Sequence, residues 1–143
     1  MYDFLLFVHV LSAFVLFSAF AGFWAITIAT RPARPLLTAA AAQALARPSG
    51  ILVGLGGLGT LVFGVWLAIY VDDYDVWDTW ILASLVLWAL STATGSRAGA
   101  FYTRAGQPGA AVHELRRRGH LLQVTATVAA LAILILMIFK PGA

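Results

Sequence analysis

Four apolar stretches, each long enough to cross a lipid bilayer, constrain this chain more than any other feature. They cover residues 2–30, 50–71, 76–96 and 119–139. A helix of roughly 20 apolar residues spans the hydrocarbon core, and a helix satisfies its backbone hydrogen bonds within one segment. Charged residues make up only 10% of the chain, against about 25% in soluble domains. The sequence therefore predicts an all-α, polytopic membrane protein, with residues 1–143 forming one membrane domain as a four-transmembrane-helix bundle.

Basic residues at the ends of the spans predict the orientation of this bundle. The first and third connectors hold eight of the nine Lys and Arg residues, and the second connector, 72–78, is acidic. The positive-inside rule then places both basic connectors in the cytoplasm. We expect an N-out/C-out protein of the plasma (inner) membrane. The arginines expected to fix this orientation are Arg31, Arg34, Arg47, Arg116, Arg117 and Arg118.

These charges lie beside lipid headgroups, so the net charge of +3 does not indicate nucleic-acid binding. The aspartates of the acidic connector fit a solvated loop that enforces topology. Collection of a divalent cation by their oxygens is the alternative, because hard ions take oxygen ligands. These aspartates are Asp72, Asp73, Asp75 and Asp78.

Prolines and one acidic residue predict where the spans begin and end. Asp3 stands where a signal peptide would carry basic residues, so we expect the first span to be retained as a helix. Pro32 and Pro35 end that span, because proline removes a backbone donor and disfavours helix in the residue before it. Pro48 is expected to break the chain between a short surface helix over 36–46 and the second span. The fourth span is expected to extend beyond the membrane from Ala110 onward.

Glycines on one face of the second span predict a tight helix–helix contact. In lipid, association depends on packing, and small residues let two backbones approach closely. A phosphate-binding loop is a poor alternative, because no P-loop lysine follows these glycines. The predicted packing residues are Gly50, Gly54, Gly57 and Gly64.

Polar residues recur at helical spacing in the third and fourth spans. Those of the third span are expected to turn inward and to bond neighbouring helices or their own backbone, and those of the fourth span are expected to line one face of the helix. In the third span they are Ser84, Trp88, Ser91, Thr92 and Gly95, and in the fourth His120, Gln123 and Thr127.

Histidine is the residue type inside the spans with the widest chemistry, and His9 lies in the outer third of the first span. An intramembrane ionisable residue is a functional candidate by default. We expect either a neutral imidazole bonded to a neighbouring helix, or a haem or metal ligand, or a proton or quinone contact. His120 is a second candidate metal ligand or an interfacial histidine beside three arginines. The two residues start from opposite membrane faces, about 15–20 Å apart, which is too far for one haem.

Three short segments resemble a known family. They are Phe4–Ala13, which contains His9, Gly64–Leu67, and the ending Leu134–Pro141 with its Lys-Pro. The chain resembles small bacterial predicted integral membrane proteins described only as a domain of unknown function. It is more distantly similar to the copper-resistance D-type membrane domain, which implies copper or haem handling through His9. The nearer resemblance implies the four-helix fold and no known activity.

The spans contain no Ser/His/Asp set and no paired carboxylates, and the chain has no cysteine, so we expect no enzyme and no resident cofactor. The preferred hypothesis is a non-enzymatic accessory or scaffold protein that acts through helix–helix association, as a homo-oligomer or within a larger membrane complex. The first alternative is a haem- or copper-linked redox or metal-handling protein using His9. The second is a small transporter, which the lack of buried charge and broken helices disfavours.

Overall fold

Four long helices make up most of the described part of the chain. The computed structural model describes residues 1–29, 38–71, 77–105, 107, 109 and 111–141. Within these residues the helices are α1 (Tyr2–Ala29), α2 (Ala39–Tyr70), α3 (Thr79–Ala105) and α4 (Val112–Phe139). Each is long and apolar enough to cross a membrane. The predicted all-α architecture with four membrane-spanning helices is therefore confirmed.

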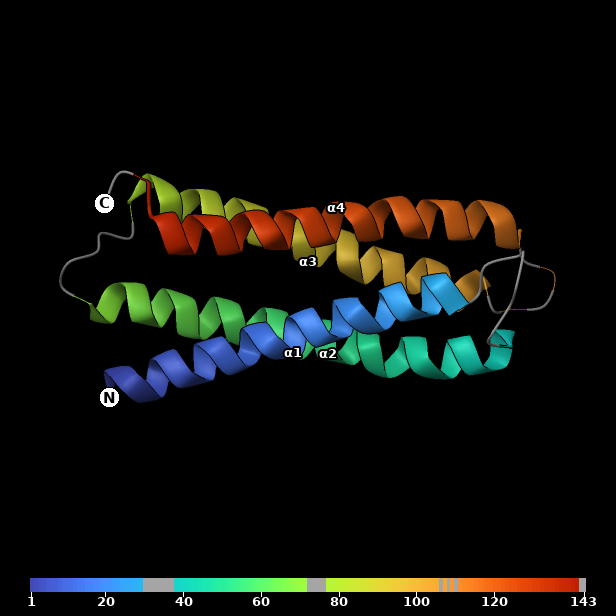
Figure 1. Ribbon diagram of the computed structural model, residues 1–143, viewed down its shortest axis with the longest axis horizontal. Coiled ribbons are helices and arrows are strands. Elements are labelled where there is room, and N and C mark those ends of the chain that lie inside the picture. Colours follow the sequence, from blue (N-terminus) through green and yellow to red (C-terminus); the bar gives the residue numbers. More distant parts are fainter. Residues whose placement is uncertain (30–37, 72–76, 106, 108, 110, 142–143) are drawn as a thin grey trace.

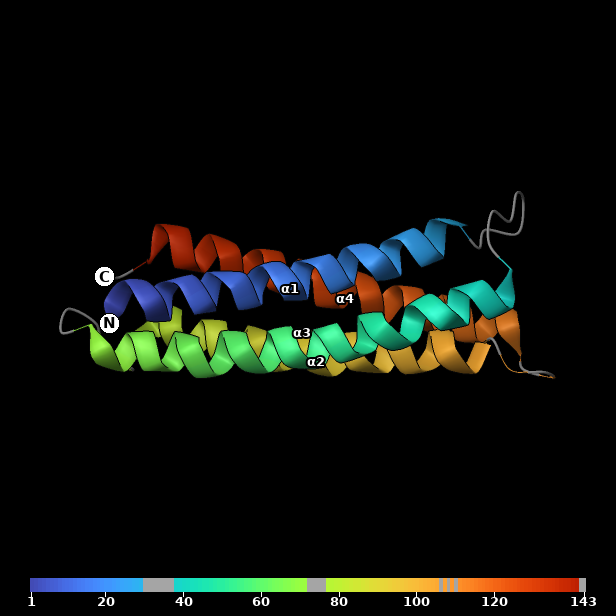
Figure 2. The same cartoon turned by 90° about the horizontal axis from the view of Figure 1, so that it is seen from below.

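The four helices form two hairpins that lie side by side. α1 packs mainly on α2 and α3 mainly on α4, while the hairpins meet chiefly through α2 and α3 (Figures 1 and 2). Both chain termini lie at one end of the bundle, which we call the terminal end (Figure 1). We call the opposite end, where α1 and α3 finish and α2 and α4 begin, the basic end.

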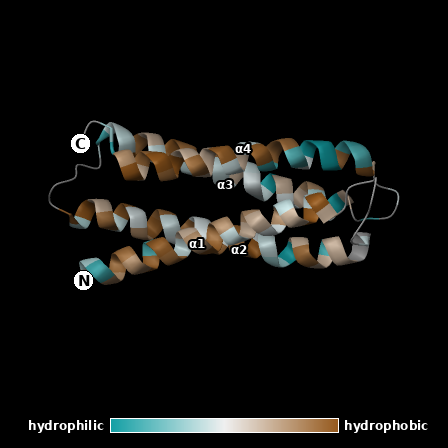
Figure 3. Ribbon diagram, in the orientation of Figure 1, coloured by the Kyte–Doolittle hydropathy of each residue, from teal (hydrophilic) through white to brown (hydrophobic). Residues whose placement is uncertain are grey.

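Each helix is longer than a bilayer requires. At 1.5 Å per residue the helices measure about 40 to 48 Å, whereas the hydrocarbon core is about 30 Å thick. α3 continues to Ala105, beyond its predicted end at residue 96. α4 begins at Val112, ahead of the predicted span 119–139, which agrees with the extension expected from Ala110 onward. Hydrophilic residues gather on the first turns of α4 (Figure 3). The additional turns at the basic end thus carry charged side chains away from the apolar centre.

α2 passes without interruption through Pro48, so the predicted break at that residue is wrong. The helix begins after Thr38, whose side chain accepts a hydrogen bond from the Ala41 amide at 3.2 Å. This N-cap opens an Ala-rich segment with high helix propensity. Ser49 donates to the Leu45 carbonyl at 3.0 Å, next to the bond that Pro48 removes. Such local compensation lets a membrane helix contain proline.

Glycine residues bring α1 and α2 into close contact. A Cβ added to Gly56 would lie 2.6 Å from the Leu16 amide nitrogen and 2.9 Å from the Ser12 carbonyl oxygen. A Cβ added to Gly59 would collide with the Ser12 side chain, and one on Gly22 would lie 2.8 Å from Ser49 Oγ. The backbones of α1 and α2 are therefore in close contact at positions where only small residues fit.

Two phenylalanines of α1 fill the centre of the bundle. Phe20 and Phe23 are almost fully buried. A Cβ on Gly95 would lie 3.1 Å from the Phe20 ring, and one on Gly99 would lie 3.0 Å from the Phe23 ring. Phe23 also stacks on Tyr102, with ring centroids 6.0 Å apart. α1 thus reaches α3 through large rings seated over glycines.

The polar face predicted for α3 does turn inward. Ser84, Ser91 and Gly95 are buried. Ser91 donates to the Ala126 carbonyl of α4 at 2.9 Å, and Trp88 Nε1 donates to the Gly57 carbonyl of α2 at 2.9 Å. These bonds link α3 to both neighbouring helices.

Substitution of Gly56 tests the close contact between α1 and α2. We expect Gly56→Ala to lower the free energy of unfolding by about 1–3 kcal/mol, because the added methyl overpacks a backbone contact. The control change Ser18→Ala alters an exposed position of α1 whose hydroxyl bonds only its own helix, and it should change the free energy of unfolding little. Denaturation of the full chain in mixed micelles, followed by circular dichroism, compares the two variants. Equal stability of both would contradict the contact.

Candidate functional site

His9 is held against α2 by one hydrogen bond and one glycine. Its Nδ1 lies 3.1 Å from the carbonyl oxygen of Thr60. Because a carbonyl only accepts, Nδ1 is the donor and carries the proton. A Cβ added to Gly64 would lie 2.9 Å from Cε1 of the imidazole, so the ring occupies the space that this glycine leaves open. The expected contact of His9 with a neighbouring helix is therefore present.

This hydrogen bond also defines what the other ring nitrogen can do. In a neutral imidazole with its proton on Nδ1, Nε2 has a free lone pair. No residue in the described part of the chain forms a hydrogen bond with Nε2. The side chain is partly exposed and lines a cavity. His9 therefore presents an acceptor nitrogen to that space.

The cavity has a volume of about 170 Å³ and lies between the two hairpins toward the terminal end. All four helices contribute to its wall, which is mostly apolar. We call it the terminal cavity. The residues on its wall that carry polar groups or indole rings are Tyr2, His9, Thr60, Trp80, Ser84, Trp88 and Lys140.

Three polar groups of the wall are committed to the protein itself. Ser84 donates to the Trp80 carbonyl at 2.7 Å, and Thr60 donates to the Gly56 carbonyl at 2.6 Å. The indole N–H of Trp88 is committed to α2, as described above. Ser84 and Thr60 therefore offer the cavity oxygen lone pairs rather than protons.

Lys140 places a positive charge at the end of α4. It is the C-cap residue, with a left-handed φ of 39°. Its ammonium group lies 6.0 Å from the centroid of the Trp80 ring, which is within the range of a cation–π contact. The terminal cavity thus combines apolar walls, an imidazole acceptor and one cation.

His120 lies at the basic end, and the fold does not bring it to His9. Its ring meets that of Trp24 edge to face, with centroids 5.4 Å apart. Trp24 and His9 are 15 residues apart on α1, or about 22 Å along its axis. One haem cannot take both histidines within a single chain at that separation. Haem or copper binding by either residue alone stays a prediction.

On the polar face predicted for α4, Gln123 and Thr127 turn toward the bundle, whereas His120 is exposed. Trp24 Nε1 donates to Thr127 Oγ1 at 3.1 Å, and Thr127 donates to the Gln123 carbonyl at 2.8 Å. Gln123 is fully buried, and its amide has no hydrogen-bond partner among the described residues. Nothing in the sequence indicated that this amide would lie in the apolar core without a partner.

Only part of the predicted glycine face packs within the chain. Gly64 contacts His9, and a Cβ on Gly57 would lie at an ordinary 3.5 Å from Thr92. Gly50 and Gly54 are exposed and have nothing within 4 Å of an added Cβ. The closest contacts with α1 are instead those of Gly56 and Gly59. A role for Gly50 and Gly54 in packing against another molecule stays a prediction.

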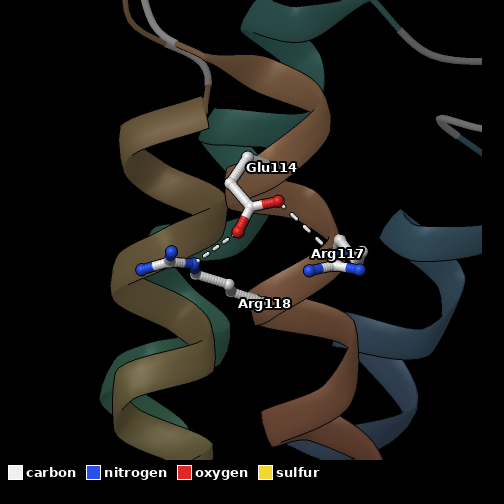
Figure 4. A network of polar contacts seen from close by, with 3 residues as sticks. All are labelled: Glu114, Arg117 and Arg118. Carbon is white, nitrogen blue, oxygen red and sulfur yellow. Dashed lines mark hydrogen bonds and ion pairs between the residues drawn. The ribbon is translucent and has the colours of Figure 1, made fainter.

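The predicted orientation residues lie at the basic end where the structure describes them. Arg31 and Arg34 lie outside the described residues, and Arg47 is exposed on α2. On α4, Arg118 Nε donates to Glu114 at 2.7 Å, and Arg117 Nε lies 3.5 Å from the same carboxylate (Figure 4). Arg116 is half-buried beside them. Exposed pairs of this kind contribute little stability. The role predicted for these arginines in fixing the membrane orientation stays a prediction.

The acidic connector lies mostly outside the described residues, which include Asp78 but not the other three aspartates. Within the described ranges, no three His, Cys, Asp or Glu side chains lie close enough together to hold a metal ion. The prediction of a cation at this connector is therefore not tested.

A double-mutant cycle tests the seat of His9 over Gly64. We expect Gly64→Ala to lower the free energy of unfolding by about 1–3 kcal/mol, because the methyl displaces the imidazole. In a His9→Ala background the same change should cost much less, since the colliding ring is absent. Unfolding in mixed micelles gives both values. A penalty that is the same in both backgrounds would show that His9 does not occupy this position.

Comparison with known proteins addresses the family but not the activity. No curated protein and no solved structure matched the chain. One family model matches residues 3–141, and its description is "Predicted integral membrane protein (DUF2269)". This match extends over all four helices and confirms the nearer resemblance, to predicted integral membrane proteins of unknown function. The bacterial origin and the likeness to the copper-resistance D-type domain stay predictions. With this match and its four membrane-spanning helices, the chain belongs to the DUF2269 family of predicted integral membrane proteins.

Proposed function

We propose that this integral membrane protein is non-enzymatic and acts through helix–helix association, pairing with a second copy of itself through the outer face of α2. The observation that carries this proposal is the position of Gly50 and Gly54. Both are exposed with open space around them, whereas Gly56, Gly57, Gly59 and Gly64 of the same helix all contact other parts of the chain. Packing within the chain therefore accounts for four glycines of α2 and leaves two unexplained.

Their spacing fits a contact between helices in lipid. Gly50 and Gly54 are four residues apart and so lie on one face of α2. Glycine in a helix interior costs roughly 0.5–1 kcal/mol relative to alanine. Two glycines that serve no internal contact are costly unless another backbone approaches them. The Gly-x-x-x-Gly spacing is the arrangement that permits such an approach in membranes.

The flanking side chains favour a second membrane helix as the partner. Ile51, Leu55 and Leu58 are all exposed next to the glycine pair. These residues suit lipid or another apolar helix, and they offer nothing to a charged soluble partner. A second copy supplies the same glycine pair on its own α2, so one self-complementary patch forms a two-fold contact.

Replacement of the glycine pair tests the association. We expect wild-type protein in liposomes to dimerise and Gly50→Leu/Gly54→Leu to weaken the dimer at least tenfold, because the side chains separate the backbones. Förster transfer between singly labelled copies, measured against protein-to-lipid ratio, gives the dissociation constant. The matched control Ala93→Leu/Ala100→Leu alters two exposed alanines of α3 and should leave it unchanged. A wild-type monomer at every ratio would overturn the proposal.

We further propose a plasma-membrane location with both termini outside. The support is the concentration of arginine at the basic end and the single lysine, Lys140, at the terminal end. The positive-inside rule assigns the arginine-rich end to the cytoplasm.

Cysteine labelling tests this orientation cleanly, because the chain has no native cysteine. Pro141→Cys lies at the terminal end and Gln107→Cys at the basic end, and both positions are exposed. In intact cells we expect a membrane-impermeant maleimide to label position 141 only. Position 107 should react after the cells are permeabilised. The reverse pattern would show that the termini face the cytoplasm.

A further inference from the structure

The terminal cavity has room for one six-membered ring. Its volume is about 170 Å³, and an engineered apolar cavity of about 150 Å³ in another protein binds benzene. Trp80, Trp88 and Met137 form part of its wall. Aromatic and thioether side chains of this kind contact a flat ring favourably. Size and lining therefore select a single aromatic ring rather than a fused polycyclic one.

The polar groups of the wall select the substituents of that ring. His9 Nε2 offers a lone pair because its Nδ1–H is bonded to Thr60. The hydroxyls of Ser84 and Thr60 donate to carbonyls of their own helices and keep only lone pairs for a ligand. The indole N–H of Trp88 is likewise committed. Tyr2 and Trp80 add a phenolic hydroxyl and an indole N–H to the wall. At His9, Thr60 and Ser84 the wall presents acceptors, so a complementary ligand donates a hydrogen bond on that side.

Lys140 adds one element of charge complementarity. Its ammonium group, which lies over the Trp80 ring, is part of the cavity wall. A charged group in the wall suits a ring with a polar substituent better than a hydrocarbon ring. A hydrocarbon ring satisfies none of these groups, and a quinone offers His9 no proton.

We infer that the terminal cavity binds the head group of a single-ring quinol or phenol, with a ring hydroxyl donating to His9 Nε2. Ligand pockets are usually apolar with a few polar groups that fix orientation, and this cavity has that composition. Its place near one end of the helices suits an amphipathic molecule whose ring lies near the membrane interface. The inference concerns binding alone and is independent of association through α2.

Calorimetric titration of the full chain in uncharged detergent tests this binding. The probe is a hydroquinone with a ten-carbon chain, kept reduced, and the matched probe is its dimethyl ether. We expect saturable one-to-one binding of the hydroquinone and at least tenfold weaker binding of the ether, which has the ring but no donor. Equal affinity for both probes, or no saturable binding of the hydroquinone, would overturn the inference.

Two variants localise the binding. His9→Asn keeps a donor near the position of Nδ1 for the Thr60 carbonyl but removes Nε2, so hydroquinone affinity should fall at least tenfold. His120→Asn, the same change at the basic end, should leave affinity unchanged. Ala68→Leu fills the cavity from its wall and should abolish binding of both probes, which keeps the test decisive if His9→Asn fails to fold. Unchanged affinity in Ala68→Leu would place the ligand elsewhere and overturn the inference.

Hydroquinone without the alkyl chain distinguishes the source of the ligand. Equal affinity with and without the chain supports a small phenol from solution. Tight binding only with the chain supports a membrane-soluble quinol. Both results support the same ring chemistry at His9.

Discussion

The backbone contact between α1 and α2 at Gly56 is the interaction on which the rest of the structure depends. Lipid provides no hydrophobic force between two apolar helices, so their pairing depends on close packing and on polar contacts. At Gly56 the neighbouring atoms are the Leu16 amide and the Ser12 carbonyl, which are backbone atoms that cannot move aside. The contact fixes the axial register of α1 against α2. That register sets His9 over Gly64 in one direction and Gly22 against Ser49 in the other.

The same register distributes large and small residues along the bundle. In the centre, Phe20 and Phe23 project from α1 onto the glycines of α3 and fill the space between the hairpins. Toward the terminal end, Gly64, Ala68 and Ser84 line the region where the hairpins face each other. Small side chains there leave the terminal cavity open. One packing arrangement therefore produces a filled core in the centre of the bundle and a ring-sized space toward its terminal end.

Periodicity and spacing predicted much of this arrangement. The face of α3 that contains Ser84 and Ser91 turns inward as expected, because a polar group in lipid needs a partner. His9 is a functional candidate from sequence alone because an ionisable side chain within an apolar run needs a partner or a function. The outcome at Pro48 differed, since the N-cap at Thr38 and the Ala-rich segment after it outweigh one missing hydrogen bond. A proline rule developed for water underestimates how strongly a helix is favoured near lipid.

The sequence by itself determined that the chain crosses a membrane four times, because apolar length and low charge leave no other way to satisfy the backbone. It also determined which helix faces are polar, since a period of 3.6 residues follows from helix geometry. Only the tertiary structure decided which glycines pack inside the chain and which remain exposed. Gly54 and Gly56 are the same residue type two positions apart, yet one faces open space and the other a backbone. Helix geometry turns the two glycines to different sides of α2, and the crossing of α1 over α2 decides which side meets a backbone. The acceptor that His9 presents to the terminal cavity follows from that crossing as well.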